Sequence, residues 1–195
     1  MRAHAFLSAV PFVFGVCADS AAVTNLLPNG SFDINVDGWT VDVNADAGSV
    51  SWQSDDADGS GLSGSLKYAT DPFGDQTAAR SPCFAVPAGG GASAGGKGNI
   101  LFVNGISRAS FAFQYGCAIY ASSNCSGASA GSLEPATSTD SGWAAMTTAN
   151  GTLPANSASA QCSIFIQNVF NAQPAAVAVD DLFFEADYIF HAGFD

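Results

Sequence analysis

The stretch SFAFQYGCAIYAS, residues 110–122, carries the clearest structural signal in the chain. Large or apolar side chains occupy every second position: Phe111, Phe113, Tyr115, Cys117 and Ile119. Successive side chains of a strand point to opposite faces of a sheet, so this alternation predicts a long strand with one buried face. The opposite face then carries small or polar residues and one ring, namely Ala112, Gln114, Gly116, Ala118 and Tyr120.

A second strand of the same kind is predicted at QCSIFIQNV, residues 161–169. Here Cys162, Ile164 and Ile166 share the core face, because they alternate with more polar positions. The other face carries Ser163, Phe165 and Gln167. The two strands together predict a sheet that is apolar on one side and mixed on the other.

The rest of the chain consists of short apolar runs between clusters of Gly, Ser, Ala, Thr and Asn, without apolar residues at helical spacing. This organisation predicts an all-β single domain, a β-sandwich of jelly-roll type, with Trp39 and Trp143 in its core. The candidate strands are residues 40–43, 49–52, 65–68, 84–86, 99–103, 110–121, 143–147, 161–169 and 176–184.

Two segments, residues 88–98 and 121–140, are predicted as long loops, where a sandwich often places a ligand or a lid. The first, AGGGASAGGKG, is rich in glycine but is not a phosphate loop. Gly98 follows Lys97 where that motif requires Ser or Thr at the start of a helix.

Residues 1–22 have the composition of a secretory signal peptide. Arg2 and His4 precede an apolar run at 5–16, and small residues follow it. The run is too short to span a bilayer, and no other segment is long and apolar enough. We therefore expect a secreted protein, extracellular or periplasmic, with a domain at 23–186 and a short tail at 187–195. A lipoprotein signal that modifies Cys17 is the alternative.

Four cysteines follow that signal, an even number that in an exported protein predicts two disulfides. Cys117 and Cys162 both face the predicted core, which favours a bridge between them and leaves Cys83 with Cys125. A bridge between Cys117 and Cys125, closing a hairpin, stays open as an alternative.

Acidic residues outnumber basic ones by 17 to 5, giving a formal net charge of −12. Such a surface repels nucleic acid and anionic lipid. It is compatible with cations, with neutral ligands such as sugars, or simply with solubility outside the cell. We expect no nucleic-acid partner.

The stretch NGSFDINVDGW, residues 29–39, contains half of a calcium loop, with Asp33, Asn35 and Asp37 at alternate positions. The twelfth position of a helix–loop–helix site should be Glu and is Asn44, and the flanks are not helical. This class of calcium site is therefore not predicted.

Three separated stretches resemble a known family. NLLPNGSFD at 25–33 with DGWTV at 37–41, and VAVDDLFF at 177–184, resemble the opening and closing strands of calcium-containing jelly-roll carbohydrate-binding modules of the galactose-binding-like class. DADGSGLSGSLKYATD at 56–71 resembles the polar loop and strand of secreted bacterial members. The resemblance implies a structural calcium held by Asp33 and by Asp180 or Asp181 with backbone carbonyls, because this hard cation prefers oxygen ligands.

Sugar-binding modules stack aromatic rings on pyranose faces and bond the hydroxyls with amides. By alternation, four candidates share the non-core face of the two long strands, and Trp52 lies in a strand of small polar neighbours. The predicted carbohydrate-binding residues are Trp52, Gln114, Tyr120, Phe165 and Gln167. Packing is the alternative role for each ring.

Catalysis is not expected. After the signal, His191 in the tail is the only histidine, which disfavours a Ser–His–Asp triad or a histidine-ligated metal. We predict a monomer that binds a polysaccharide or other glycan. The alternatives are a structural or adhesive envelope protein on the same fold and a small glycoside hydrolase, which needs two convergent carboxylates.

Overall fold

The structure is a computed structural model that describes residues 23–42, 48–70, 77–103, 112–137, 142–167 and 174–187. The predicted signal peptide, and the predicted tail beyond residue 187, lie outside the described residues and stay predictions. In the ranges given, no helix has the length and hydropathy needed to cross a membrane.

Thirteen strands make up the regular structure of the described residues. They are β1 Thr40–Val41, β2 Gly48–Gln53, β3 Ser65–Thr70, β4 Thr77–Arg80, β5 Phe84–Ala85, β6 Gly91–Val103, β7 Ala112–Tyr120, β8 Ser129–Leu133, β9 Ala136–Thr137, β10 Ala144–Ala145, β11 Ala149–Thr152, β12 Ser159–Gln167 and β13 Ala175–Ala186.

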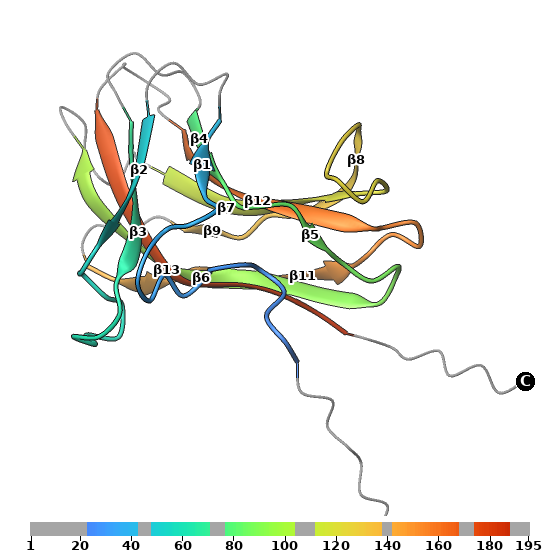
Figure 1. The fold of residues 1–195 in the computed structure, drawn as a ribbon, viewed down its shortest axis with the longest axis horizontal. Helices are drawn as coiled ribbons and strands as arrows, with labels where there is room; N and C mark the ends of the chain where they lie inside the picture. Colours follow the sequence, from blue (N-terminus) through green and yellow to red (C-terminus); the bar gives the residue numbers. More distant parts are fainter. Residues whose placement is uncertain are drawn as a thin grey trace, which may run out of the picture.

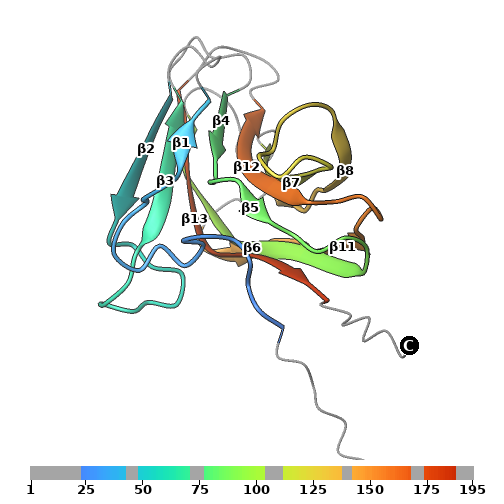
Figure 2. The ribbon, with the colours of Figure 1, turned by 45° about the vertical axis from the view of Figure 1, so that its right-hand side comes forward.

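The strands form two antiparallel sheets that face each other (Figures 1 and 2). The first sheet has the order β1-β4-β12-β7-β8, with β5 beside β12 and β9 beside β7. The second has the order β10-β6-β13-β3-β2, with β11 beside β6. The predicted all-β sandwich of jelly-roll type is therefore confirmed.

The centre of the first sheet is the pair β7 and β12, and its alternation is as predicted. Phe113 and Tyr115 have no exposed surface, and Cys117 and Ile119 have 1%. Cys162, Ile164 and Ile166 of β12 are buried beside them. Each buried Ile or Phe side chain among them contributes about 1.5–3 kcal/mol through removal from water. The predicted core residue Phe111 lies outside the described residues.

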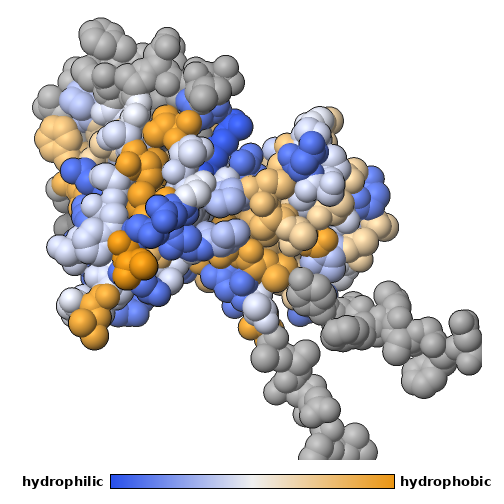
Figure 3. All heavy atoms as spheres, in the orientation of Figure 1, coloured by the Kyte–Doolittle hydropathy of each residue, from blue (hydrophilic) through white to orange (hydrophobic). Residues whose placement is uncertain are grey.

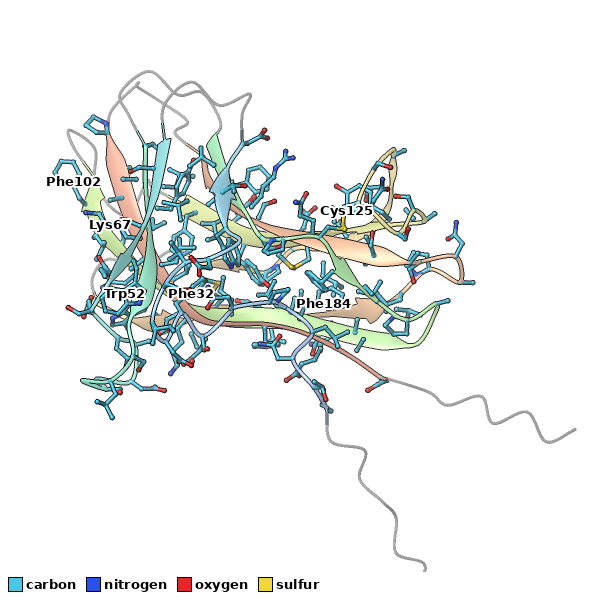
Figure 4. All side chains as sticks on the ribbon, in the orientation of Figure 1. Phe32, Trp52, Lys67, Phe102, Cys125 and Phe184 are labelled. Carbon is cyan, nitrogen blue, oxygen red and sulfur yellow. A yellow bond between two sulfur atoms is a disulfide. The ribbon has the colours of Figure 1, made fainter. Side chains whose placement is uncertain are left out.

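The second sheet supplies the other half of the core through β13. Val177, Val179, Leu182 and Phe184 are buried on its inner side, and Figure 4 shows Phe184 between the two layers. Its ring meets Phe84 of the first sheet edge-on, with centroids 5.4 Å apart. This contact joins the two sheets by an arrangement that aromatic pairs prefer.

The opening segment lies beside the end of β13, although they are far apart in sequence (Figure 1). The amide of Leu26 donates to Phe184 O at 2.8 Å, and the amide of Leu182 donates to Gly30 O at 2.9 Å. A side chain at Gly30 would lie 2.1 Å from Leu182 O, so the approach requires glycine. Two of the three stretches that carry the family resemblance, the opening and the closing one, are thus neighbours in space.

The structure corrects both predicted long loops. Residues 91–98, inside the predicted loop at 88–98, belong to β6, and β8 and β9 lie within 121–140. Gly95 and Gly98 of β6 make room for the rings of Phe183 and Phe113, which a Cβ would meet at 2.7 and 2.2 Å. The segment is poor in large residues because its partners supply them.

Both disulfides have the favoured pairing. Cys117 and Cys162 are directly opposite each other in β7 and β12. Cys83 joins Cys125 in the loop after β7, so the alternative bridge between Cys117 and Cys125 is wrong.

The two tryptophans assigned to the core differ. Trp39 is 5% exposed and packs edge-on against Phe32. Trp143 is only half-buried, and its assignment to the core is wrong. It directly precedes β10, which pairs at the edge of the second sheet, so that one side of the residue remains open.

Candidate functional site

A groove of about 390 Å³ lies on the outer face of the first sheet. In Figure 3 the surface is hollowed between the part that carries β4 and the part that carries β8. Its lining comes from β4, β7, β8 and β12 and from Glu134, just beyond β8. The described side chains that give it its chemistry are Arg80, Gln114, Gly116, Ala118, Tyr120, Ser132, Glu134, Gln161, Ser163 and Phe165.

The floor of the groove follows from the register of the two central strands. Ser163 lies opposite Gly116, and Gln161 lies opposite Ala118. Because opposed residues of neighbouring strands share a face, Ser163, Gly116 and Ala118 form a shallow surface of small residues, and Gln161 lies beside it. The floor is therefore low where a ligand would have to rest.

Aromatic rings stand near the two ends of this floor. Phe165, 38% exposed, lies opposite Gln114, and Tyr120 is half-buried at the end of β7. Gln114 and Tyr120 are six positions apart on β7, which corresponds to about 20 Å of strand. Ring faces and an amide thus border an extended surface.

The side walls carry opposite charges. Arg80 of β4 forms an ion pair with Asp42, and Glu134 lies across the floor just beyond the end of β8. Two strands, β12 and β7, lie between β4 and β8, so the walls are about 14 Å apart at the backbone. Among the described residues the Glu134 carboxylate has no hydrogen-bond or ion-pair partner.

The structure brings three of the five predicted carbohydrate-binding residues together here, namely Gln114, Tyr120 and Phe165. The backbone of Gln167 continues β12 opposite Ala112, but its side chain lies outside the described part of the chain.

Trp52 is not part of the groove, which corrects its grouping with the other four. It lies on β2, the edge strand of the second sheet, and Figure 4 shows it at the opposite end of the molecule from Cys125. Its Nε1 atom donates to Phe32 O at 2.8 Å. Trp52 lies opposite the fully buried Leu66, so it points inward at the rim of the core.

The lining residues that were not predicted are Arg80, Ser132, Glu134, Gln161 and Ser163. The alternation that indicated Phe165 also applies to Gln161 and Ser163, so these two residues could have been predicted from the sequence. Arg80 and Glu134 reach the groove through β4 and β8, which have no alternating pattern.

The residues predicted to hold calcium have different surroundings. Asp180 is 2% exposed, and its carboxylate accepts hydrogen bonds from the amides of Ala57 at 3.0 Å and Asp181 at 2.8 Å. Burial raises the pKa of Asp180 to about 6, against these hydrogen bonds, and the nearby carboxylates of Asp181 and Asp56 add to the rise. A cation would relieve this burial of charge, so Asp180 suits the predicted role.

Asp181 and Asp33 suit the role less well. Asp181 pairs with Lys97 at 2.8 Å, and its hydrogen bond, with that of Asp58, raises the pKa of this lysine. Asp33 is exposed. Within the described ranges there is no group of three or more His, Cys, Asp or Glu that could hold a metal ion, so a calcium ion here would depend largely on backbone oxygens.

No family model and no curated protein matches the chain. Solved structures with a similar fold include the enzymatically active domain of tailspike protein 4 of bacteriophage CBA120, with a TM-score of 0.62 and 13% identity over 84% of this chain. The chain spans only 21% of that tailspike chain.

Isolated carbohydrate-binding modules match over nearly their whole length. The family 16 carbohydrate-binding module 2 has a TM-score of 0.53 and 15% identity, covering 82% of this chain and 99% of the module. The xylan-binding module CBM22-2 of Paenibacillus barcinonensis Xyn10C has a TM-score of 0.54 and 14% identity, covering 81% and 98%. At these identities the likeness establishes the shared β-sandwich fold.

Proposed function

We propose that this protein is an exported, non-catalytic module that binds a glycan in the groove over β7 and β12. The observation that carries the proposal is the placement of Phe165 and Tyr120 at the two ends of a floor of small residues, with Gln114 opposite Phe165. Ring faces stack on the apolar faces of sugars, and amides bond their hydroxyls. The fold shared with carbohydrate-binding modules supports this function.

The carboxylates of the groove favour binding over hydrolysis. A glycosidase of the usual kind places two carboxyl groups on either side of the scissile bond. Among the described lining residues Glu134 is the one carboxylate, and Asp42 behind Arg80 is held in an ion pair. The groove is therefore better equipped to hold a sugar than to cleave it.

Affinity electrophoresis against a panel of polysaccharides tests the proposal. Wild-type protein should be retarded by at least one polymer, and Phe165→Ala and Tyr120→Ala should lose that retardation. Phe102→Ala is the matched control, because Phe102 is also exposed but lies on β6 of the other sheet. Absence of retardation by every polymer, or equal loss in the control, would contradict the proposal.

We propose further that calcium binds where the opening segment meets β13, with Asp180, Asp33 and backbone carbonyls as ligands. There it would neutralise the buried Asp180 and join two stretches distant in sequence. The burial and raised pKa of Asp180 support this role.

The proposal of export is supported by the two disulfides, which are typical of oxidising compartments.

A further inference from the structure

The groove has a free negative charge and no free positive one among its described residues. The guanidinium of Arg80 is already neutralised by Asp42. The carboxylate of Glu134, on the opposite wall, has no such partner among the residues described. A charged ligand would therefore meet an acidic groove.

Glu134 is also placed to reach a bound ligand. A Cβ on Gly116 would lie 3.4 Å from the Glu134 Cγ atom, so the glutamate stem leans over the lowest part of the floor. Any larger residue at position 116 would occupy the space between this side chain and the sheet. The carboxylate therefore stands beside the place where a sugar ring would rest.

Two polar groups of the groove, Gln161 and Glu134, offer acceptors to a ligand. The amide nitrogen of Gln161 donates to Ser81 O at 3.0 Å, and a carboxylate only accepts. The ring faces of Phe165 and Tyr120 attract cations through their quadrupoles. The net charge of −12 adds a long-range attraction for positive ligands.

We propose that the groove prefers glycans built from amino sugars with a free, protonated amine over neutral glycans, and disfavours uronates. This inference rests on the proposed glycan binding and adds the class of sugar. The ammonium group pairs with Glu134 while the sugar ring lies over Gly116. A uronate would instead bring a second carboxylate next to Glu134.

Calorimetric titration with matched oligosaccharides tests the preference. The ligands are a glucosamine oligosaccharide, its N-acetylated counterpart of the same length, and a uronate oligosaccharide, in mildly acidic buffer of low ionic strength. We expect the free amine to bind about fivefold more tightly than the acetylated form, because a partly exposed ion pair contributes a binding free energy of that order. Salt should reduce the ratio, and the uronate should bind most weakly.

Two charge-matched variants identify the source of the preference. Glu134→Gln should abolish the fivefold ratio, whereas Glu185→Gln, on β13 of the other sheet, should keep it. Equal affinities for the two amino-sugar ligands, or equal effects of both variants, would overturn the preference and leave glycan binding intact. Failure to bind these ligands and every polymer of the panel would overturn both proposals.

Discussion

At the scale of single residues, Gly116 sets the depth of the groove. It lies opposite Ser163 at the centre of the floor, and a Cβ there would make ordinary contacts, at 3.4 Å to Glu134 Cγ and 3.6 Å to Leu133 O. A larger side chain should therefore fill the groove without disturbing the sheet beneath it.

Gly116→Leu should reduce glycan affinity by at least about tenfold, or about 1.4 kcal/mol. Its melting temperature should stay close to that of the wild type, because the new side chain points into the groove and not into the core. Gly61→Leu is the control, since nothing lies within 4 Å of a Cβ at that position. Calorimetric titration with the retarding polymer measures the effect, and undiminished affinity would place the ligand elsewhere.

The surroundings of Asp56 predict how the stability of the fold depends on acidic pH. Its carboxylate accepts hydrogen bonds from Ser63 Oγ and from the amides of Ser60 and Asp58. The Ser63 bond is the largest cause that lowers the pKa of Asp56 below its ordinary value of 3.8, followed by that of Ser60. A lowered folded pKa stabilises the fold above the unfolded pKa, and that stabilisation is lost as the pH falls through the folded pKa.

Ser63→Ala should therefore be less stable than wild type at neutral pH, and the difference should shrink as the solution becomes more acidic than pH 3.8. Urea unfolding at a series of pH values measures this difference. Leu62→Ala, at a neighbouring exposed position, should show no such pH dependence. A Ser63→Ala deficit that persists unchanged in acid would contradict the assignment.

At the scale of elements, β7 and β12 could be predicted from sequence because their own residues alternate between large and small. The second half of β6 was predicted at 99–103, but residues 91–98 were not, because this half consists mostly of glycine and alanine and packs against rings from other elements. Phe113 fills the space at Gly98, and Phe183 that at Gly95. A local sequence pattern shows the large side chains that a strand itself places in the core. It does not show the side chains of other elements that pack against that strand.

For the same reason, only some of the groove residues could be predicted from the sequence. Gln114, Tyr120 and Phe165 could be predicted because they alternate with core residues on the two central strands. Arg80 and Glu134 depend on which elements pair beside those strands, a long-range outcome that no local pattern encodes. Trp52 misleads because its polar neighbours suggest an exposed strand, although it lies opposite the buried Leu66.

Trp52→Ala should lower the free energy of unfolding by about 2 kcal/mol, less than for a fully buried ring because Trp52 is 40% exposed. The loss includes the hydrogen bond to Phe32 O. Retardation by polysaccharide should be unchanged. Urea unfolding and affinity electrophoresis on the same preparation separate the two effects, and loss of retardation with full stability would return Trp52 to the ligand site.

The junction of the opening segment with β13 is the element that calcium should stabilise. Removing calcium with a chelator should lower the melting temperature by about 5–10 °C, the equivalent of saturation at about one hundred times the dissociation constant. Asp180→Asn should lose most of this response, and Asp58→Asn should retain it. A melting temperature that does not change when the chelator is added would refute the calcium site.

At the scale of the whole molecule, two covalent bridges tie the chain together. Cys117 and Cys162 close a loop with a sequence separation of 45 residues. Replacing both by alanine should cost about 3–4 kcal/mol of unfolding free energy by the chain-entropy argument. Urea unfolding of this double variant against the wild type, both without reductant, measures the cost. A loss that vanishes under these conditions would mean that the bridge does not form in solution.

The meeting of the opening segment with β13 also has a consequence for how the molecule is made. Asn25 donates to Leu182 O across 157 positions of sequence, so the segment synthesised early acquires its partners only when nearly all the described chain is available. Contacts of such large separation slow folding, because chain entropy is lost before they form. The sandwich should therefore close late and in one step, and under the proposed export this delay would keep the chain unfolded during its passage across a membrane.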